Sequence, residues 1–411
     1  MERRIVITGI GVISTFGTGK DILWENVRDG ISGIRRTQGF DVEDYSVKIS
    51  GECLGVNPEE FITPNEVKRT DRYIHFAYAA AKLCVEDSGI DLEKCDLERF
   101  GVIMGTGIGG LGTLCADAIR LDKAGPRKVS PFYIPASIAN MSSGMLSIQY
   151  GLKGPNFVTV TACASSTHAM GESLNYIRRG LTDLVMTGGS EAAIVPSGYA
   201  GFANMGALSK RNDEPQRASR PFDRERDGFV IGEGGVVFIF EEREHAKKRN
   251  AKIYGEVVGY GNSADAYHIT APAPGGEGAV RCMNMAIKDA GISPDDINYI
   301  NAHGTSTPYN DKTETVAIKT VFGDRAYKIP ISSTKSVVGH LLGGSGAIEL
   351  SASLMGIQNG MVHQTANYEF PDPECDLDYV PGESREHKVN YMLKNSFGFG
   401  GQNASLVVKA P

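Results

Sequence analysis

FVTVTACASSTHAMGESLNYIRR, residues 157–179, passes from one kind of regular structure to another with no turn sequence between them. The β-branched and aromatic residues at 157–161 predict a short strand, and the run of small residues at 163–179 predicts a helix. A strand that leads directly into a helix is typical of α/β folds. Cys163 lies where the strand stops and the helix starts.

The same alternation runs through the first half of the chain. Residues 4–13, 101–106 and 184–192 are apolar runs that end in glycines or small residues, and each predicts a buried strand. Residues 66–88 place apolar side chains three and four apart, which predicts a helix with one apolar face. These segments predict an α/β fold with mostly buried strands.

The second half repeats this plan in the same order, which predicts an internal duplication with a pseudo-twofold axis. The repeated segments are strand-like 253–262, 297–305 and 391–401, together with 328–333 leading into a glycine-rich helix at 340–359. We expect two similar halves, 1–250 and 251–411, that pack as one body. The polar stretch 209–227 is predicted to be a long surface excursion.

Composition excludes several classes of protein. The chain has 411 residues, 41% of them hydrophobic, and a net charge of −7, which is ordinary for a globular protein. An acidic chain with a pI near 5.7 is not expected to bind nucleic acid through bulk charge. No apolar run approaches the roughly 18 residues that span a bilayer, and MERRIVITGIGVIS predicts a first strand rather than a signal peptide.

The seven cysteines indicate a reducing compartment. Their number is odd, no C-x-x-C pair occurs, and no secretion signal precedes them, so we expect free thiols and a cytoplasmic protein. A zinc ribbon or a dithiol redox site is not expected. Most of these cysteines are predicted to be small buried hydrophobes.

Cys163 is the exception that the pattern singles out. A thiol at a helix N-terminus has its thiolate stabilised by the helix dipole and by free backbone N–H groups, and small neighbours leave the sulfur accessible. The arrangement predicts a nucleophile elbow built around cysteine. The alternative from local sequence is a packed core cysteine.

Three further strand ends carry polar or aromatic side chains. His303 follows an apolar strand in NAHGTSTP, where the alternatives are a pocket residue and a buried histidine satisfied by a carbonyl. In STKSVVGH, Lys335 is either a partnered, semi-buried lysine or a surface one, and His340 is expected to open a helix and stay neutral there. Phe397 and Phe399 alternate with glycines in NSFGFGG, which suits a gate or an ordinary aromatic turn.

One cysteine and two histidines at the ends of equivalent strands should converge at one edge of the sheets, the usual ligand side of α/β folds. Together they predict acyl transfer by a cysteine nucleophile assisted by two imidazoles.

These motifs resemble those of the β-ketoacyl-[acyl-carrier-protein] synthases of the thiolase superfamily, over essentially the whole chain. The closest resemblance is to the elongating synthase II type of bacterial type II fatty-acid synthesis, which 209–227 and DAYHITAP at 265–272 favour over type I. The matching segments are TACASS around Cys163, 218–235, NAHGTSTPYNDKTE from Asn301, SSTKSVVGHLLGGSGAIE from Ser332, and NSFGFGG from Asn395.

The resemblance implies two βαβαβαββ halves in five layers, α-β-α-β-α, and a homodimer paired through the strand near Cys163. It implies a 3-oxoacyl-[acyl-carrier-protein] synthase that elongates a Cys163-bound acyl chain by two carbons through decarboxylative Claisen condensation with malonyl-carrier protein. The backbone N–H groups of Cys163 and Phe399 would form the oxyanion hole. His303 and His340 would stabilise the enolate.

The resemblance also assigns supporting residues. Lys335 would organise the site through Glu349. The substrate-binding residues would be Thr305 and Thr307 at the pantetheine arm, Phe397 and Phe399 at the gate, Ile108 at the end of the acyl pocket, and Thr270.

The partner implied is an acidic acyl carrier protein, which needs basic docking residues on this acidic enzyme. The candidates are Lys68, Arg69, Arg127, Lys128, Lys210 and Arg211. No cofactor is implied, because Gly9-Ile10-Gly11 and Gly107-Ile108-Gly109 lack the acidic partner of a dinucleotide site. A structural cation near Asn301, Glu349 and Asn395 is the only metal that the resemblance implies.

Gln402 departs from the pattern, since relatives commonly have Thr after Phe-Gly-Gly, and this leaves the chain-length preference open. Two alternatives also stay open. One is a polyketide-type ketosynthase with the same chemistry, and the other is a non-catalytic partner subunit of a ketosynthase heterodimer, against which the retained Cys-His-His set argues.

Overall fold

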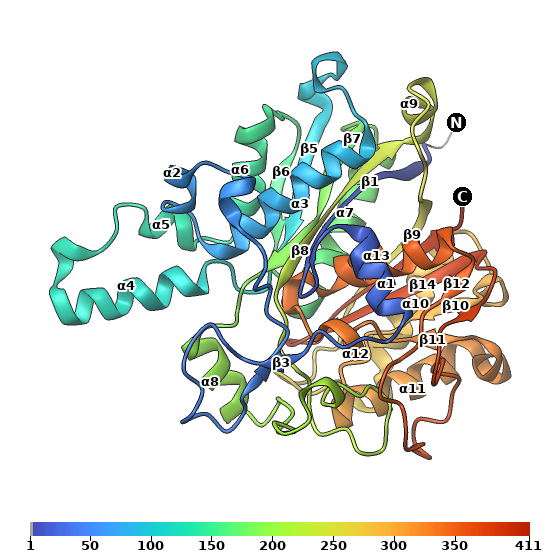
Figure 1. Ribbon diagram of the computed structural model, residues 1–411. Coiled ribbons are helices and arrows are strands. Elements are labelled where there is room, and N and C mark those ends of the chain that lie inside the picture. The colour runs from blue at the N-terminus through green and yellow to red at the C-terminus, as the bar shows by residue number, and fades with distance from the viewer. Residues whose placement is uncertain (1–2) are drawn as a thin grey trace.

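The computed structural model describes residues 3–411, and within them the strands form one main sheet whose order is symmetric about its centre (Figure 1). From one edge to the other the strands are β11 (Ile331–Ser332), β10 (Tyr299–Asn301), β14 (Tyr391–Gly398), β15 (Gln402–Lys409), β9 (Gly255–Ala264), β1 (Ile5–Ser14), β8 (Gly234–Glu242), β7 (Leu184–Glu191), β5 (Phe100–Gly105) and β6 (Asn156–Thr159). A short strand, β2 (Gly17–Thr18), pairs with β1.

Each half of this order has the same connectivity, β-α-β-α-β-α-β-β, so the predicted duplicated fold is confirmed. The principal helices are, in the first half, α3 (Arg72–Ser88), α6 (Met141–Tyr150) and α7 (Ser165–Arg178), and in the second α10 (Glu277–Asp289), α11 (Pro308–Phe322) and α13 (Ser345–Gln358). The halves join where β1 and β9 pair antiparallel over only three residues, Ile5–Ile7 opposite Gly255–Val257.

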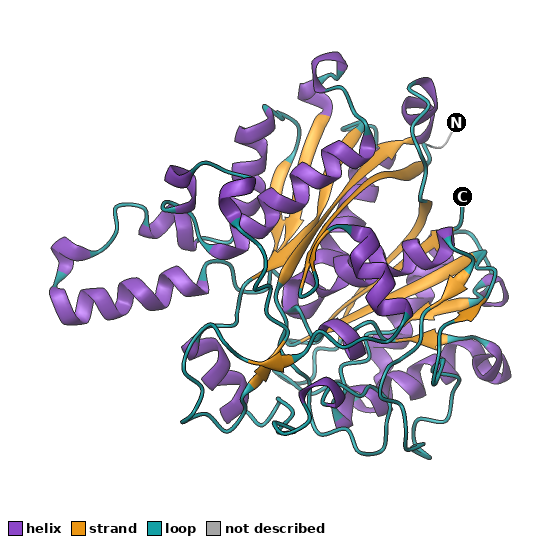
Figure 2. Ribbon diagram, in the orientation of Figure 1, coloured by secondary structure: helices purple, strands orange, loops and turns teal. Residues whose placement is uncertain are grey.

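The two half-sheets diverge from this joint and enclose a central helical layer. Helices α7 and α13 lie between them, whereas α3 and α6 cover one outer face and α10 and α11 the other (Figure 2). Every residue of α13 from Ser345 to Gly356 is buried, as expected for a helix that contacts protein on all sides.

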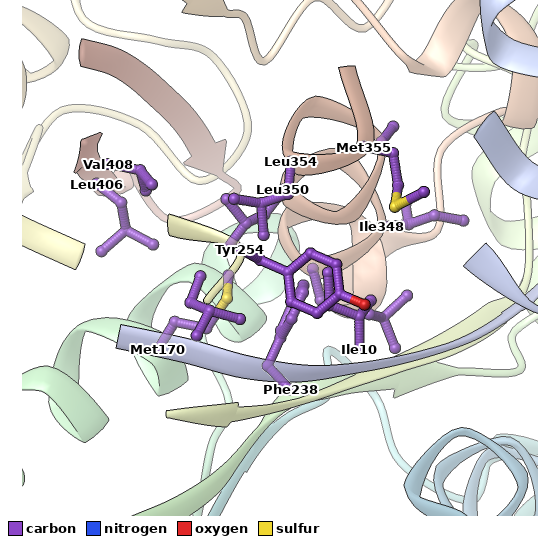
Figure 3. Close-up of a cluster of buried hydrophobic side chains, with 14 of the residues drawn as sticks. Ile10, Met170, Phe238, Tyr254, Ile348, Leu350, Leu354, Met355, Leu406 and Val408 are labelled. Carbon is purple, nitrogen blue, oxygen red and sulfur yellow. The ribbon is translucent and has the colours of Figure 1, made fainter. Parts of the chain in front are cut away.

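The central core joins the two halves into one body. Figure 3 shows Met170 of α7 and Leu350 and Leu354 of α13 packed between Phe238 of β8 and Leu406 of β15. All five side chains are fully buried. Burial of each stabilises the fold by roughly 1.5–3 kcal/mol relative to exposure.

Glycines set the distance between strand and helix at equivalent places in the two halves. A Cβ atom at Gly11 of β1 would lie 1.9 Å from the Ala80 carbonyl oxygen of α3, and one at Gly261 of β9 would lie 2.0 Å from the Cys282 carbonyl oxygen of α10. The Gly9-Ile10-Gly11 sequence therefore serves close helix packing.

Three boundaries differ from the sequence predictions. The helix expected at 66–88 is divided, because Asp71 caps a new helix, α3, after the short α2 (Pro64–Val67). The helix expected at 340–359 begins only at Ser345, because Gly339 takes a φ of 75° after the short α12 (Lys335–Val338). His340 is thus in extended backbone, bridged to Ile231, and not at a helix N-terminus.

The prediction that 209–227 lies on the surface is wrong for the second part of this stretch. Arg220 and Asp223 form an ion pair in which neither side chain has any exposed area. Arg226, also buried, pairs with Asp372. The charges of these three residues are satisfied by one another and by the 369–372 loop rather than by water.

The remaining elements lie around this framework. They are α1 (Lys20–Arg28), α4 (Leu111–Ala124), α5 (Tyr133–Ser137), α8 (Pro196–Asn204), α9 (Arg243–Lys248) and the small strand pairs β3 (Arg35–Arg36) with β4 (Ile49–Ser50) and β12 (Met361–Val362) with β13 (Arg385–Glu386). Among residues 3–411, none of the helices combines the length and the apolar character that a membrane crossing requires.

Candidate active site

The predicted strand ends converge on one cavity of about 510 Å³. Cys163 follows β6 in the first half, and His303 and Phe397 come from the ends of β10 and β14 in the second. Parallel strands end at a common edge of a sheet, which is where the duplicated fold brings both sets of residues together. Donor atoms of Cys163, His303 and His340 all lie within 4.8 Å of one another.

Cys163 lies in a strained turn. The residue before it, Ala162, has a φ of 48°, and the 3₁₀ turn Ala162–Ala164 leads into α7. Ser165 holds this turn by accepting a hydrogen bond from Thr161 N at 2.8 Å and donating one to the Ala162 carbonyl at 2.7 Å. Strain of this kind is common at functional sites because the surrounding structure maintains it.

The thiol of Cys163 is not stabilised as a thiolate in the free enzyme. Burial raises its pKa to about 11, although the Lys335 charge and the Phe399 N–H act in the opposite direction. The cost of desolvating the charge thus opposes the stabilisation of the thiolate that the sequence led us to expect from the helix dipole.

His340 presents a protonated Nε2 atom to the sulfur. Nε2 lies 3.1 Å from Cys163 Sγ, while Leu342 N donates to Nδ1 at 3.2 Å and Ser345 Oγ lies 2.7 Å from Nδ1. A backbone N–H can only donate, so Nδ1 accepts and the ring proton belongs on Nε2.

His303 has the same tautomer as His340, for a different reason. The Lys335 ammonium lies 3.3 Å from its Nδ1 atom and donates to its carbonyl oxygen at 2.6 Å. An ammonium has no acceptor, so Nδ1 of His303 also accepts and Nε2 carries the proton. The His303 and His340 rings are 5.5 Å apart between centroids and almost perpendicular.

Both imidazoles are neutral near pH 7, as predicted for His340. Burial lowers the pKa of each well below its ordinary value, and the positive charges of Lys335 and Lys394 lower it further. The cause is burial and nearby cations, not the helix dipole expected from the sequence.

Lys335 and Glu349 lie behind His303 as the resemblance implied, and both are buried. The cation site expected near Asn301, Glu349 and Asn395 does not fit the structure. Both oxygens of Glu349 already face ammonium groups, those of Lys335 and Lys394, which would repel a further cation. Asn395 uses its amide group toward Glu314 and accepts from Ser405.

The residues expected to bind substrate all line the cavity: Ile108, Thr270, Thr305, Thr307, Phe397 and Phe399. Thr305 and Thr307 are linked through their hydroxyls at 2.8 Å.

The two glycines beside Phe399 differ in backbone conformation. Gly400 has a φ of 80°, which favours glycine, whereas Gly398 has an ordinary φ. A Cβ atom at Gly398 would lie 2.8 Å from the Thr161 carbonyl oxygen and 3.2 Å from Cys163 N. Gly398 therefore allows the two loops to touch, and Gly400 is the position with conformational freedom.

The basic residues expected to dock a carrier protein lie mainly on the surface. Lys68, Arg69, Arg127, Lys128 and Lys210 are exposed. Arg211 is half-buried and paired with Glu214 and Glu225, so its charge is already partly neutralised.

Several site residues were not found by sequence reasoning. Glu314 accepts hydrogen bonds from the backbone N–H groups of His303 and Gly304, at 2.9 and 2.8 Å. Glu191 does the same for Gly107, at 2.6 Å, and burial raises the pKa of this carboxyl to about 7. The signal available for Glu191 was a carboxylate between small and apolar residues, whereas Glu314 closes the NAHGTSTPYNDKTE segment among polar neighbours.

Sequence reasoning also missed Phe229, which lies against His340, and Lys394, which lies close to Glu349. The Phe229 ring meets the His340 ring edge to face, 5.2 Å apart between centroids. Lys394, in the middle of β14, is completely buried.

The fold and this site define a condensing enzyme of the thiolase type, an acyltransferase with a cysteine nucleophile. Residues 2–246 match the family described as "Beta-ketoacyl synthase, N-terminal domain" and residues 254–369 match "Beta-ketoacyl synthase, C-terminal domain". The chain belongs to the β-ketoacyl synthase family.

Relatives resemble it over their whole length. The chain is 50% identical to the 3-oxoacyl-[acyl-carrier-protein] synthase 2 of Synechocystis sp. and 47% identical to that of Coxiella burnetii, in each case over 99% of this chain and 98% of the relative. Among solved structures, it is similar to a type II PKS ketosynthase in complex with its acyl-carrier protein and bound to the hexaketide, with TM-score 0.93, 36% identity and complete coverage of both chains. A β-ketoacyl synthase from Burkholderia phymatum matches with TM-score 0.93 and 33% identity, again with complete coverage of both chains.

Proposed function

We propose that this protein is an elongating 3-oxoacyl-[acyl-carrier-protein] synthase. The observation that carries the proposal is the cluster of Cys163, His303 and His340, in which the sulfur and one ring nitrogen of each imidazole lie within 4.8 Å of one another and both imidazoles carry their proton on Nε2. The names of relatives at 47–50% identity support the same activity.

In the first half-reaction, Cys163 Sγ attacks the carbonyl of an acyl-carrier thioester. The new C–S bond forms as the C–S bond to the carrier breaks, and the carrier leaves as its free thiol with the proton that Cys163 gives up. The N–H groups of Cys163 and Phe399 stabilise the oxyanion, where one such donor is worth about 3–4 kcal/mol. The Phe399 N–H already faces the sulfur, which supports this role.

In the second half-reaction, malonyl-carrier protein loses carbon dioxide and becomes an enolate. The Nε2–H groups of His303 and His340 donate to the thioester oxygen on which the negative charge develops. The enolate carbon attacks the acyl-Cys163 carbonyl, forming a C–C bond, and Cys163 leaves and takes up a proton. The product is a 3-oxoacyl-carrier thioester two carbons longer.

Neutral histidines suit this step because they are donors before the charge appears. Lys335 keeps Nδ1 of His303 as an acceptor and so keeps the proton on Nε2, which makes it a positioning residue rather than one that reacts. Thr305 and Thr307 would contact the pantetheine arm, Thr270 and Ile108 the rest of the substrate, and the Phe397–Phe399 segment would admit the acyl chain. Their positions on the cavity wall support these assignments.

The partner is an acyl carrier protein, for which exposed Lys68, Arg69, Arg127, Lys128 and Lys210, with Arg211, would supply positive charge. A structural neighbour crystallised with its own carrier protein supports this proposal.

We also propose a homodimer paired through β6, one of the two edge strands of the main sheet. Exposed apolar side chains beside this edge support the interface, with Ile148 and Val160 exposed by 74% and 51%. Light scattering at micromolar concentration tests it, and a monomer contradicts it.

The seven free cysteines support a reducing, cytoplasmic location. The division into halves at 1–250 and 251–411 stays a prediction. Residues 1 and 2 of the first half lie outside those that the structure describes.

A polyketide-type ketosynthase is the second candidate, because a similar solved structure is a type II PKS ketosynthase. The same chemistry would apply to a different carrier. Comparing condensation rates on a fatty-acid carrier and on a polyketide carrier separates the two. The higher identity to synthase 2 relatives favours the fatty-acid carrier.

Mass spectrometry after mixing with an acyl-carrier thioester tests the central proposal. We expect one acyl adduct, on the Cys163 peptide, and a 3-oxoacyl product when malonyl-carrier protein is added to the pure protein. Cys115→Ala should retain the adduct and Cys163→Ala should lose it. An adduct elsewhere, or none, contradicts the proposal, and a pure protein that is acylated but never condenses favours a partner-subunit role.

A further inference from the structure

Glu349, on the central helix α13, lies between two buried lysines. Lys335 faces Oε1 and Lys394 faces Oε2, the latter at 2.6 Å, and each of the three side chains is at most 1% exposed. Buried charges are stable only when paired, and one carboxylate pairs with one ammonium. The second lysine therefore needs an explanation.

Lys394 is coordinated as a small cation would be. Its ammonium contacts the Asn395 carbonyl oxygen at 2.7 Å, the Ser396 hydroxyl and the Glu349 carboxylate. The first two oxygens accept hydrogen bonds from the ammonium, and the Glu349 carboxylate supplies the opposite charge 2.6 Å away without hydrogen-bond geometry.

The position of Lys394 in the sheet coincides with the site at which the family resemblance implied a structural cation. It pairs with Asn301 of β10 across the parallel register and precedes Asn395 in β14. Asn301, Asn395 and Glu349 are the three residues expected around that cation. The ammonium of Lys394 occupies the place where a free ion would have to sit.

A chain of contacts leads from Lys394 to the reacting groups. Lys394 holds one oxygen of Glu349, the other oxygen holds Lys335, and Lys335 contacts Nδ1 and the carbonyl oxygen of His303. Glu314, which accepts from the His303 N–H, is the second buried carboxylate beside this network. Two lysines thus balance two carboxylates.

We propose that Lys394 is a positioning residue: its ammonium supplies, from within the chain, the cation that Glu349 requires to hold Lys335 against His303. The protein then needs no inorganic cation at this place. Its effect on catalysis rests on the condensing activity proposed above, whereas its effect on cation binding does not.

The charge of Lys394 also acts on both imidazoles in the direction that the reaction requires. Together with burial it lowers the pKa of His303 and of His340, which keeps them neutral donors. Burial lowers the pKa of Lys394 itself to about 8, so assays at pH 7 keep it charged.

Lys394→Ser tests the proposal, because it removes the ammonium and leaves room for a free ion between Glu349 and Asn395. Lys388→Ser is the matched control, an exposed lysine shortly before the same strand. Both variants and the wild type are dialysed into tetramethylammonium buffer at pH 7, and potassium, sodium or ammonium is then added. The readouts are the thermal unfolding midpoint and the condensation rate.

For the wild type and Lys388→Ser, we expect the unfolding midpoint and the condensation rate to be the same in potassium, sodium or ammonium as in tetramethylammonium. For Lys394→Ser in tetramethylammonium, we expect condensation slowed by roughly tenfold or more, as for loss of over a kcal/mol of transition-state stabilisation. Ammonium or potassium should restore most of the rate and raise the unfolding midpoint by about 2 °C or more, because an ion that binds only the folded state stabilises it.

Three results would overturn the proposal. The first is a Lys394→Ser variant with the wild-type rate in tetramethylammonium. The second is a variant whose loss of rate or stability no small cation repairs, which would indicate packing alone. The third is a wild type whose unfolding midpoint rises specifically with potassium or sodium, and this decides the question even if the variant does not fold. A wild type that fails to condense at all would instead contradict the proposed function, while the unfolding data would still test Lys394.

Discussion

The Nε2 atom of His340 lies 3.1 Å from the Sγ atom of Cys163, and the two residues come from opposite halves of the duplicated fold. The other nitrogen of His340 accepts a backbone N–H, so the atom nearest the sulfur is a donor. A donor in this place cannot remove the thiol proton. It can stabilise an oxygen that develops negative charge beside the sulfur, which supports the role in the enolate step that we propose for His340.

Ser345→Ala should slow decarboxylation of malonyl-carrier protein by about threefold to tenfold, because one neutral hydrogen bond of about 1 kcal/mol no longer orients His340. The Leu342 N–H still holds the tautomer, which limits the loss. The rate of carbon dioxide release by the purified variant measures the decarboxylation. Ser353→Ala, which removes a hydroxyl bonded within the same helix, is the control and should leave the rate unchanged. Equal rates in both variants would refute the orienting role.

His303→Ala and His340→Ala should each lower decarboxylation by about a hundredfold to a thousandfold, the usual cost of losing one donor to an oxyanion. Formation of the acyl-Cys163 adduct should survive, since neither imidazole is needed for it. Cys163→Ala should abolish condensation yet retain decarboxylation. Radioactive carbon dioxide release and mass spectrometry of the adduct separate the two steps. Unimpaired decarboxylation in both histidine variants would overturn the assignment.

Alkylation of Cys163 by iodoacetamide should accelerate about tenfold for each pH unit between pH 7 and pH 9, with no plateau. Burial raises the thiol pKa to about 11, so the reactive thiolate is a small fraction that grows throughout this range. Peptide mass spectrometry at Cys163 gives the rate, and the Cys163→Ala variant accounts for the other cysteines. A plateau below pH 8 would show that the thiolate is stabilised in the free enzyme.

The convergence of Cys163 and His303 on one cavity could be predicted from sequence because their positions follow from topology. Cys163 and His303 end parallel strands, and a duplicated fold brings the ends of equivalent strands to one cavity. The repeat order of the strands was likewise visible in the segments 101–106 and 297–305, which became β5 and β10 at equivalent places in the sheet.

Other properties depend on contacts that no local pattern records. Lys394 stands in the apolar run YMLKN, where alternation gives no sign that α13 covers it. The polar residues Arg220 and Asp223 suggested a surface loop, although their mutual pairing allows burial. The pKa of Cys163 follows from desolvation by the whole cavity rather than from the single helix that begins after it.

Gly398→Ala should slow acylation of Cys163 while leaving the fold intact. A Cβ atom there would press on the Thr161 carbonyl oxygen and on Cys163 N, so the loop that carries the nucleophile must shift. Misplacement of a reacting atom by a fraction of an ångström costs roughly tenfold or more in rate. The rate of the initial burst of adduct formation measures the acylation of Cys163. Gly201→Ala, at a position with nothing within 4 Å of its Cβ, is the control. Matching burst rates would show that the contact does not constrain the nucleophile.

Asp223→Asn should destabilise the protein by about 3–5 kcal/mol, the usual effect of leaving a buried charge without its partner. Asp223 accepts from Arg220 at 3.0 Å and from three backbone N–H groups, those of Glu225, Glu369 and Phe370. An amide in its place leaves the Arg220 charge uncompensated and directs two donors at groups that also donate. Urea unfolding measures the difference, with exposed Asp213→Asn as the control. Because Arg220 precedes the loop that leads to Phe229, whose ring contacts that of His340, the variant should also lose condensation activity as it unfolds. If Asp223→Asn unfolds at the same urea concentration as Asp213→Asn, the 215–227 segment is not stabilised by this pair.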